Sequence, residues 1–196
     1  MGDLVPFRRI EGSTEELSDD ALVLAASTGD RAALAALFDR FHADVYRFLA
    51  RIASGHLDAI DDLVQTTFLE AYRAAPRFGR RSTVRTWIFG IATNIARHHI
   101  RDEGRRRAAM TRAADLPRAA PIQPDELVEQ SDEAQEIVRA IAALPEPLRV
   151  AYVMCVVEEV PAKEAAIALE TREGTLWRRV HEAREALRRM LERTGR

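Results

Sequence analysis

The sequence contains very few residues of several chemically important types. Cys155 is the only cysteine among 196 residues, which excludes an internal disulfide and is typical of a reducing compartment. Lys163 is the only lysine, so arginine supplies nearly all of the positive charge. Glycine-rich phosphate loops are absent, and the five histidines do not have a zinc-binding spacing with the single cysteine. We therefore expect no cofactor, no metal site and no catalytic centre.

Long apolar runs are also absent. No stretch approaches the ~20 consecutive apolar residues that a membrane-spanning helix needs. The first residues lack the apolar segment that secretory signals contain. Together with the single cysteine, these absences predict a cytoplasmic protein that does not insert into a membrane.

A net charge of −2 leaves little excess of either sign. Taken alone, this value argues against a nucleic-acid-binding protein. The sign of the charge alternates along the chain, however. Residues 1–71 and 119–171 carry net charges of −7 and −8, whereas residues 72–118 and 172–196 carry +9 and +4. The two basic segments are therefore candidates for nucleic-acid contact.

Apolar residues recur at steps of three and four through most of the chain, which predicts helices. No segment has the alternation of apolar and polar residues that predicts a strand. Four helices are predicted between residues 18 and 104, and their long apolar faces favour a four-helix bundle. Ser18 or Asp19 is the expected N-cap of the first helix, and Asp30 is that of the second. Ser82 or Thr83 is the expected cap of the fourth, which we expect to end at Gly104.

The second half of the chain begins with a change in composition. Residues 107–131 combine several prolines with small and polar residues, which predicts a flexible linker. Further apolar stripes then predict helices over 132–144, 148–157 and 162–169, and a final basic helix that forms a helix-turn-helix with its predecessor. We thus expect an all-α protein of two small helical domains, 18–106 and 132–196, preceded by a flexible tail, 1–17.

Two segments have the composition of nucleic-acid-binding surfaces. Residues 77–107 combine a basic loop, spaced arginines and Phe89 on the helix face opposite the apolar one, which suits single-stranded DNA. Residues 161–191 carry polar and basic groups at the start of the second helix of the helix-turn-helix, which suits a major groove. A solvated basic helix and an ordinary amphipathic hairpin are the alternatives that composition leaves open.

Four segments carry motifs in a fixed order: DDLVQTTF at residues 61–68, TVRTWIFGIATN at 83–94, ALPEPLR at 143–149 and GTLWRRVHEAR at 174–184. Together they resemble the extracytoplasmic-function (ECF, group IV) sigma factors of the sigma-70 family. Residues 61–68, DDLVQTTF, resemble the region 2.2 motif EDLVQExF. Residues 83–94, TVRTWIFGIATN, resemble the xxxxWLYRIAxN block of region 2. Residues 143–149, ALPEPLR, are similar to the ALPxxxR opening of region 4, and residues 174–184, GTLWRRVHEAR, resemble GTVKSRLHRAR. The resemblance covers about residues 18–192.

This resemblance implies a factor that binds core RNA polymerase and directs it to promoter DNA, with region 2 opening and reading the −10 element and region 4 reading the −35 element. The implied polymerase contacts are Asp61, Asp62, Gln65 and Thr66. The implied −10 contacts are Phe78, Arg80, Arg81, Ser82, Phe89, Asn94, Arg97 and Arg101. The implied −35 contacts are Arg172, Thr175, Trp177, Arg178, His181 and Arg184. The family also implies an anti-sigma factor as a partner.

The chain departs from the family pattern at several positions. Gly90 replaces an arginine inside a helix, and Glu170 replaces a turn glycine, where a positive φ is disfavoured for other residues. Trp177 replaces a lysine, so it contacts either DNA or a protein. A stand-alone helix-turn-helix regulator is the alternative function, although it gives residues 77–107 no role. A helical enzyme and an adaptor without DNA contact are further alternatives.

Overall fold

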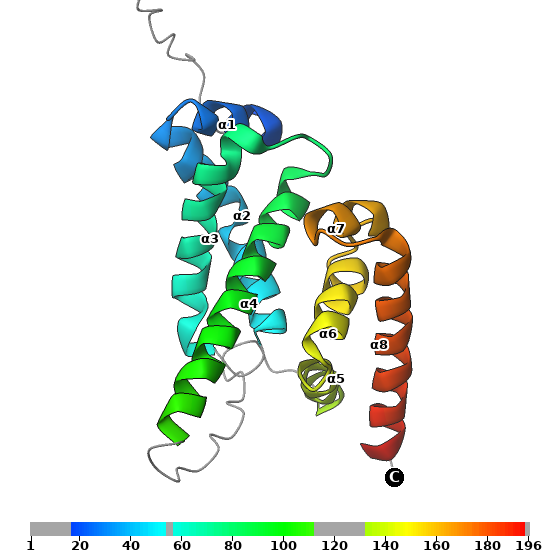
Figure 1. Ribbon diagram of the computed structural model, residues 1–196. Coiled ribbons are helices and arrows are strands. Elements are labelled where there is room, and N and C mark those ends of the chain that lie inside the picture. Colours follow the sequence, from blue (N-terminus) through cyan, green and yellow to red (C-terminus); the bar gives the residue numbers. More distant parts are fainter. Residues whose placement is uncertain (1–16, 54–56, 112–131, 195–196) are drawn as a thin grey trace, which may run out of the picture.

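The computed structural model describes residues 17–53, 57–111 and 132–194, and all of the regular structure in these ranges is helical (Figure 1). The N-terminal unit contains α1 (Asp19–Ser27), α2 (Arg31–Ile52), α3 (Ile60–Ala74) and α4 (Val84–Thr111). The C-terminal unit contains α5 (Asp132–Ala142), α6 (Glu146–Tyr152), α7 (Ala162–Ala168) and α8 (Glu173–Thr194). Single turns, η1 (Leu57–Ala59) and η2 (Ala75–Arg77), flank α3, and a π-helical turn, η3 (Val153–Val157), continues α6.

Side-chain caps begin the first two helices where the sequence predicts them. The Ser18 hydroxyl accepts a hydrogen bond from the backbone N–H of Ala21 at 3.3 Å. The Asp30 carboxylate accepts two, from Ala32 at 2.8 Å and Ala33 at 3.3 Å. Gly29, with φ +95°, makes the left-handed turn between α1 and α2 that other residues adopt only with strain. Of the two residues that the sequence offers as the first cap, Ser18 is therefore the one used, and the predicted cap Asp30 is confirmed.

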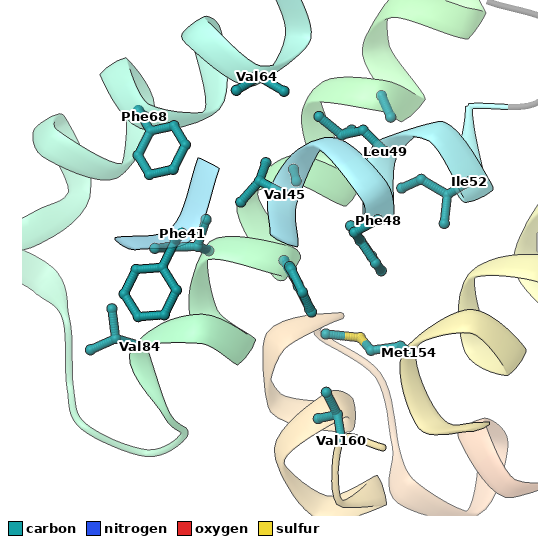
Figure 2. Close-up of a cluster of buried hydrophobic side chains, with 14 of the residues drawn as sticks. Phe41, Val45, Phe48, Leu49, Ile52, Val64, Phe68, Val84, Met154 and Val160 are labelled. Carbon is teal, nitrogen blue, oxygen red and sulfur yellow. The ribbon is translucent and has the colours of Figure 1, made fainter. Parts of the chain in front are cut away.

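The apolar stripe of α2 forms the centre of the N-terminal bundle (Figure 2). Its buried residues are Ala33, Leu37, Phe41, Val45, Phe48, Leu49 and Ile52. Val64 and Phe68 of α3 and Val84 of α4 complete this part of the core. The three- and four-residue steps that predicted the helix therefore also identify the face that it buries.

The last two helices form the predicted helix-turn-helix. Leu176, Val180, Ala183 and Leu187 are the buried residues of α8, and they follow one stripe along the helix. Glu170, in the turn between α7 and α8, has a φ of +50°. The turn therefore keeps its left-handed conformation without the glycine that the family usually has there.

The two units share one hydrophobic core, an arrangement that the sequence does not predict. Met154 and Val160 of the C-terminal unit lie against the same cluster as Phe48 of α2 (Figure 2). Helices α4 and α7 lie side by side (Figure 1), and a Cβ atom at Gly90 would lie only 2.5 Å from the carbonyl oxygen of Ala168. A side chain larger than glycine does not fit at this crossing, which explains the departure at residue 90.

The predicted end of the fourth helix is wrong. Helix α4 continues through Gly104 to Thr111, so residues 107–111 of the expected linker are helical. Ion pairs one turn apart, Arg105 with Asp102 and Arg106 with Glu103, support the helix across the glycine, which costs only about 1 kcal/mol relative to alanine. The rest of the expected linker, 112–131, and residues 1–16 of the expected tail lie outside the described residues.

Candidate nucleic-acid interface

The basic loop before α4 brings together four of the predicted −10 residues. Phe78 is half-buried against Trp87, with the two ring centroids 4.8 Å apart. Arg80 and Arg81 are exposed, and Arg80 lies 3.6 Å from the carboxylate of Asp20. Ser82 is half-buried. An aromatic pair next to two exposed guanidinium groups can stack on an unpaired base and contact the phosphates beside it.

Thr83 provides the cap of α4. Its hydroxyl oxygen accepts a hydrogen bond from the backbone N–H of Thr86 at 3.2 Å, and its own backbone carbonyl accepts from Trp87 at 3.0 Å. Of the two residues that the sequence offers as the cap, Thr83 is therefore the one used.

The placement of Phe89 on an exposed face of α4 is wrong. Phe89 is 0% exposed, and its ring stacks on Phe48 at 4.3 Å between centroids. The guanidinium group of Arg85 covers the ring at 4.6 Å. The error has a physical cause: the helical wheel assumes one packing partner, whereas α4 packs against α2 and α3 and also against α7. Phe89 is therefore a core residue and no longer a candidate DNA contact.

The polar residues further along α4 reach the surface to different degrees. Asn94 and Arg101 are exposed. Arg97 is mostly covered and donates a hydrogen bond to the Glu146 carboxylate of the C-terminal unit at 2.7 Å. Arg97 and Arg101 line an open cavity of about 570 Å³ together with Glu146, Glu170 and Arg179. Arg101 is thus exposed to solvent, whereas Arg97 contacts the C-terminal unit.

The first turns of α8 and the residues just before it present the predicted major-groove surface. The exposed residues are Arg172, Trp177, Arg178, His181 and Arg184, and Thr175 is half-buried. Trp177 is 53% exposed, and Arg178 lies 3.6 Å from the Glu182 carboxylate on the same helix. The predicted residues of this helix therefore do form one solvent-facing surface beside the buried stripe.

The acidic motif at the start of α3 divides between core and solvent. Asp61, Asp62, Gln65 and Thr66 are all exposed, while the apolar residues of the motif are buried. Among the exposed large apolar side chains that the sequence interpretation missed, Tyr46 of α2 at 40% exposure and Leu69 of α3 at 54% belong to the two helices of this surface. Tyr46 and Gln65 line a hollow of about 580 Å³ between α2 and α3. A large apolar residue off the main stripe of each helix is the signal that would have identified them.

Comparison with known proteins decides the family. Residues 37–106 match sigma-70 region 2, and residues 134–187 match sigma-70 region 4. The chain is 34% identical to the ECF RNA polymerase sigma factor SigC of Mycobacterium tuberculosis, across 89% of this chain and 94% of that protein. It is 30% identical to the ECF RNA polymerase sigma-E factor of Escherichia coli, across the same shares. The chain belongs to the ECF sigma factors. Sigma factors are known as non-enzymatic transcription initiation factors, and the present chain is a sigma factor that directs RNA polymerase to promoters.

Two solved structures have the same fold. The sigma factor RpoE of Bartonella quintana, solved with the anti-sigma factor NepR, aligns with a TM-score of 0.64 at 24% identity, over 80% of this chain and 94% of that chain. CnrH, solved with the cytosolic domain of CnrY, aligns with a TM-score of 0.63 at 22% identity, over 89% and 97%. We therefore refer to the N-terminal unit as region 2 and to the C-terminal unit as region 4.

Among residues 17–53, 57–111 and 132–194, no three histidine, cysteine or acidic side chains are grouped to hold a metal ion. Within the same ranges, no helix has the length and apolarity needed to cross a membrane. Burial raises the pKa of the Cys155 thiol to about 11, so this thiol is protonated at neutral pH and poorly nucleophilic.

Proposed function

We propose that this sigma factor divides promoter recognition among three of its surfaces. The exposed side of α3 binds core polymerase, the loop 78–83 with α4 reads the melted −10 strand, and α8 reads the −35 duplex. The observation that supports this division is the match between charge and exposure. The two basic segments of the chain carry the loop, α4 and α8, where arginines face solvent, whereas α3 begins with exposed carboxylates.

The polymerase surface combines polar and apolar groups. Exposed acidic and amide side chains of α3 lie beside Tyr46 and Leu69. Interfaces of this kind obtain most of their binding energy from a few apolar or aromatic residues surrounded by polar ones. We therefore add Tyr46 and Leu69 to the proposed polymerase contacts Asp61, Asp62, Gln65 and Thr66.

The −10 surface is proposed without Phe89. Arg80, Arg81 and Arg101 supply exposed positive charge, and Asn94 supplies a polar side chain for base edges. The aromatic contribution comes from Phe78, held in place by Trp87. Ser82 and Arg97 complete the proposed set. Such a surface follows a single strand by its phosphates and holds unstacked bases on its aromatic rings.

The −35 surface is proposed as Arg172, Thr175, Trp177, Arg178, His181 and Arg184. A helix that presents basic and polar groups from its first turns is the arrangement that helix-turn-helix proteins insert into a major groove. Trp177 provides a large apolar group for contact with a thymine methyl, in place of the usual cation.

An anti-sigma factor is also a proposed partner. Both structural neighbours above were solved in complexes that contain a partner protein, named an anti-sigma factor in the case of NepR. We propose that the present factor acts in the cytoplasm and is likewise held by a protein partner before it reaches polymerase.

Run-off transcription with purified core polymerase and a library of genomic promoter fragments tests the function. We expect transcripts that require both the factor and a shared −10 and −35 sequence. A factor that neither binds core polymerase nor yields a promoter-dependent product would contradict the proposal. Tight, sequence-specific duplex binding by the factor without polymerase would instead favour a stand-alone helix-turn-helix regulator.

A further inference from the structure

Three carboxylates of region 4 contact the basic side of region 2. Glu158 accepts a hydrogen bond from Arg51 at 2.6 Å and also pairs with Arg85. Glu146 accepts from Arg97 at 2.7 Å. Glu164 accepts from the backbone N–H of Thr83, the cap of α4, at 3.0 Å. The contacts thus extend along α4 from its first residue to its middle.

Glu158 is at the centre of this contact. Its side chain is only 7% exposed, and two guanidinium groups of region 2 balance its charge. Arg85 is held in place in turn by Asp44, at 2.9 Å, and by the ring of Phe89. A carboxylate that is largely removed from water depends on such partners, because an uncompensated buried charge is strongly destabilising. The pairing therefore contributes directly to closure of the two regions.

Apolar packing completes the closed arrangement. Met154 and Val160 of region 4 lie in the core cluster that contains Phe48 and Phe89 of region 2. Gly90 lets α7 approach α4 closely enough that a Cβ would meet the Ala168 carbonyl. The arrangement is also matched in charge, since residues 132–171, with net charge −5, include the helices that pack against residues 72–111, with net charge +8.

Two of the donors that these carboxylates use, the Arg97 guanidinium group and the Thr83 N–H, belong to the proposed −10 surface. Arg97 is a proposed −10 contact, and Thr83 ends the loop proposed to surround a flipped base. A DNA strand would offer phosphate oxygens to the same donors, because phosphate and carboxylate groups are both anionic acceptors for guanidinium and backbone N–H groups. A donor that is directed at Glu146 or Glu164 is not available to a phosphate at the same time.

We infer that region 4 occupies the −10-reading face of region 2 as an intramolecular competitor of promoter DNA. Glu146 and Glu164 take the place of DNA phosphates, and Glu158, paired with Arg51 and Arg85, holds region 4 in this position. The factor by itself is therefore closed, and the two regions must separate before α4 reads the −10 strand. This inference rests on the proposed −10 role of α4.

Distance measurements on the full chain test the closure itself. Spin labels at Ala35→Cys and Glu192→Cys, two exposed positions in α2 and α8, report the separation of the regions in a Cys155→Ala background. We expect one narrow distance for the parent and a longer, broad distribution for Glu158→Gln. Glu185→Gln is the matched control, because Glu185 pairs only within α8 with Arg188 and loses the same charge. An unchanged distance in Glu158→Gln, or a broad one in the parent, overturns closure.

A second pair of variants covers the case in which Glu158→Gln fails to fold. Arg97→Glu and Glu146→Arg should each lengthen the distance, because each places two like charges at the Arg97–Glu146 contact. The double variant restores opposite charges and should return the short distance. If the double variant is as open as the single ones, the ion pair does not hold the regions together.

Binding of single-stranded DNA tests the competition. The probe is a fluorescein-labelled pool of random single-stranded 20-mers, titrated with the full-length factor. Loss of a hydrogen-bonded charge pair should lower the ratio of closed to open factor about tenfold, so Glu158→Gln should bind the pool about tenfold more tightly than the parent. Glu185→Gln should stay within about twofold. Equal affinities of Glu158→Gln and Glu185→Gln overturn the competition.

The inference and the proposed function can fail separately. Arg101→Ala leaves the three carboxylate contacts intact. If this variant binds the pool as tightly as the parent and forms open complexes normally, the proposed −10 role of α4 fails. Closure is then judged by the spin-label distances alone. If the distances do not respond to Glu158→Gln or to the charge swap, closure fails while the −10 role is judged by Arg101→Ala.

Discussion

The crossing of α4 and α7 at Gly90 offers a sharp test of the packing between the two regions. In Gly90→Ala, the new Cβ would lie 2.5 Å from the Ala168 carbonyl oxygen and 3.1 Å from the Ala168 Cβ. The first distance is about 1 Å shorter than an ordinary contact, and a backbone carbonyl cannot rotate away as a flexible side chain does. The helices must therefore separate, or one backbone must shift.

Two opposing contributions determine the size of the effect. Alanine is favoured over glycine inside a helix by about 1 kcal/mol. Overpacking of a close contact costs about 1–3 kcal/mol. The net change for Gly90→Ala should thus lie between about zero and 2 kcal/mol of destabilisation. Gly104 is the matched control, since it lies in the same helix and a Cβ added there would meet nothing within 4 Å, so Gly104→Ala should stabilise by about 1 kcal/mol.

Thermal unfolding followed by circular dichroism measures the difference. For a chain of this size, 1 kcal/mol corresponds to about 2–4 °C in Tm. We expect Gly104→Ala to raise the Tm by about that amount and Gly90→Ala to leave it unchanged or lower it. The spin-label distance between α2 and α8 should increase in Gly90→Ala alone. If Gly90→Ala raises the Tm as much as Gly104→Ala, the close approach of α4 and α7 does not exist in solution.

Three further predictions concern single side chains. Arg149 is buried and donates hydrogen bonds to the carbonyls of Ile52, Ala142 and Leu144 at 3.0, 3.0 and 2.7 Å. Arg149→Met should therefore lower the free energy of unfolding, measured by urea titration, by about 2–4 kcal/mol. A loss below about 1 kcal/mol would contradict this structural role. Burial raises the pKa of Cys155 from 9.0 to about 11, which lowers the thiolate fraction at pH 8 about 100-fold. Because a more basic thiolate is also more nucleophilic, alkylation by iodoacetamide should be about tenfold slower than at an introduced Ala35→Cys, and equal rates would refute the shift. Arg101→Ala should weaken open-complex formation about tenfold while binding to core polymerase stays constant. The control Arg188→Ala, also at an exposed arginine, should leave open-complex formation unchanged. Equal loss of open-complex formation and core binding in Arg101→Ala would refute the −10 assignment.

The sequence by itself predicts the helices and most of the exposed surfaces. Apolar residues at steps of three and four define the buried faces of α2 and α8, because a helix must bury one stripe wherever it packs. Ser18 and Asp30 cap the helices that they precede, because a cap depends only on neighbouring backbone N–H groups. The polar motif residues of α3 and α8 reach solvent because they lie on the side of the helix away from its buried stripe.

Tertiary structure decided the rest, and α4 shows why. A helical wheel shows which residues share a face, but it does not show how many partners a helix has. Phe89 lies on the polar side of α4 in the sequence and in the core of the protein, because its ring stacks on Phe48 of α2. From its residue type and position, Arg97 is predicted to contact DNA. In the structure, its guanidinium group pairs with Glu146 of region 4. Gly90 has no local reason to be glycine, and its reason lies 78 residues away at Ala168. Local periodicity determined the helices and caps of this sigma factor, whereas long-range packing determined which charged side chains remain available for DNA.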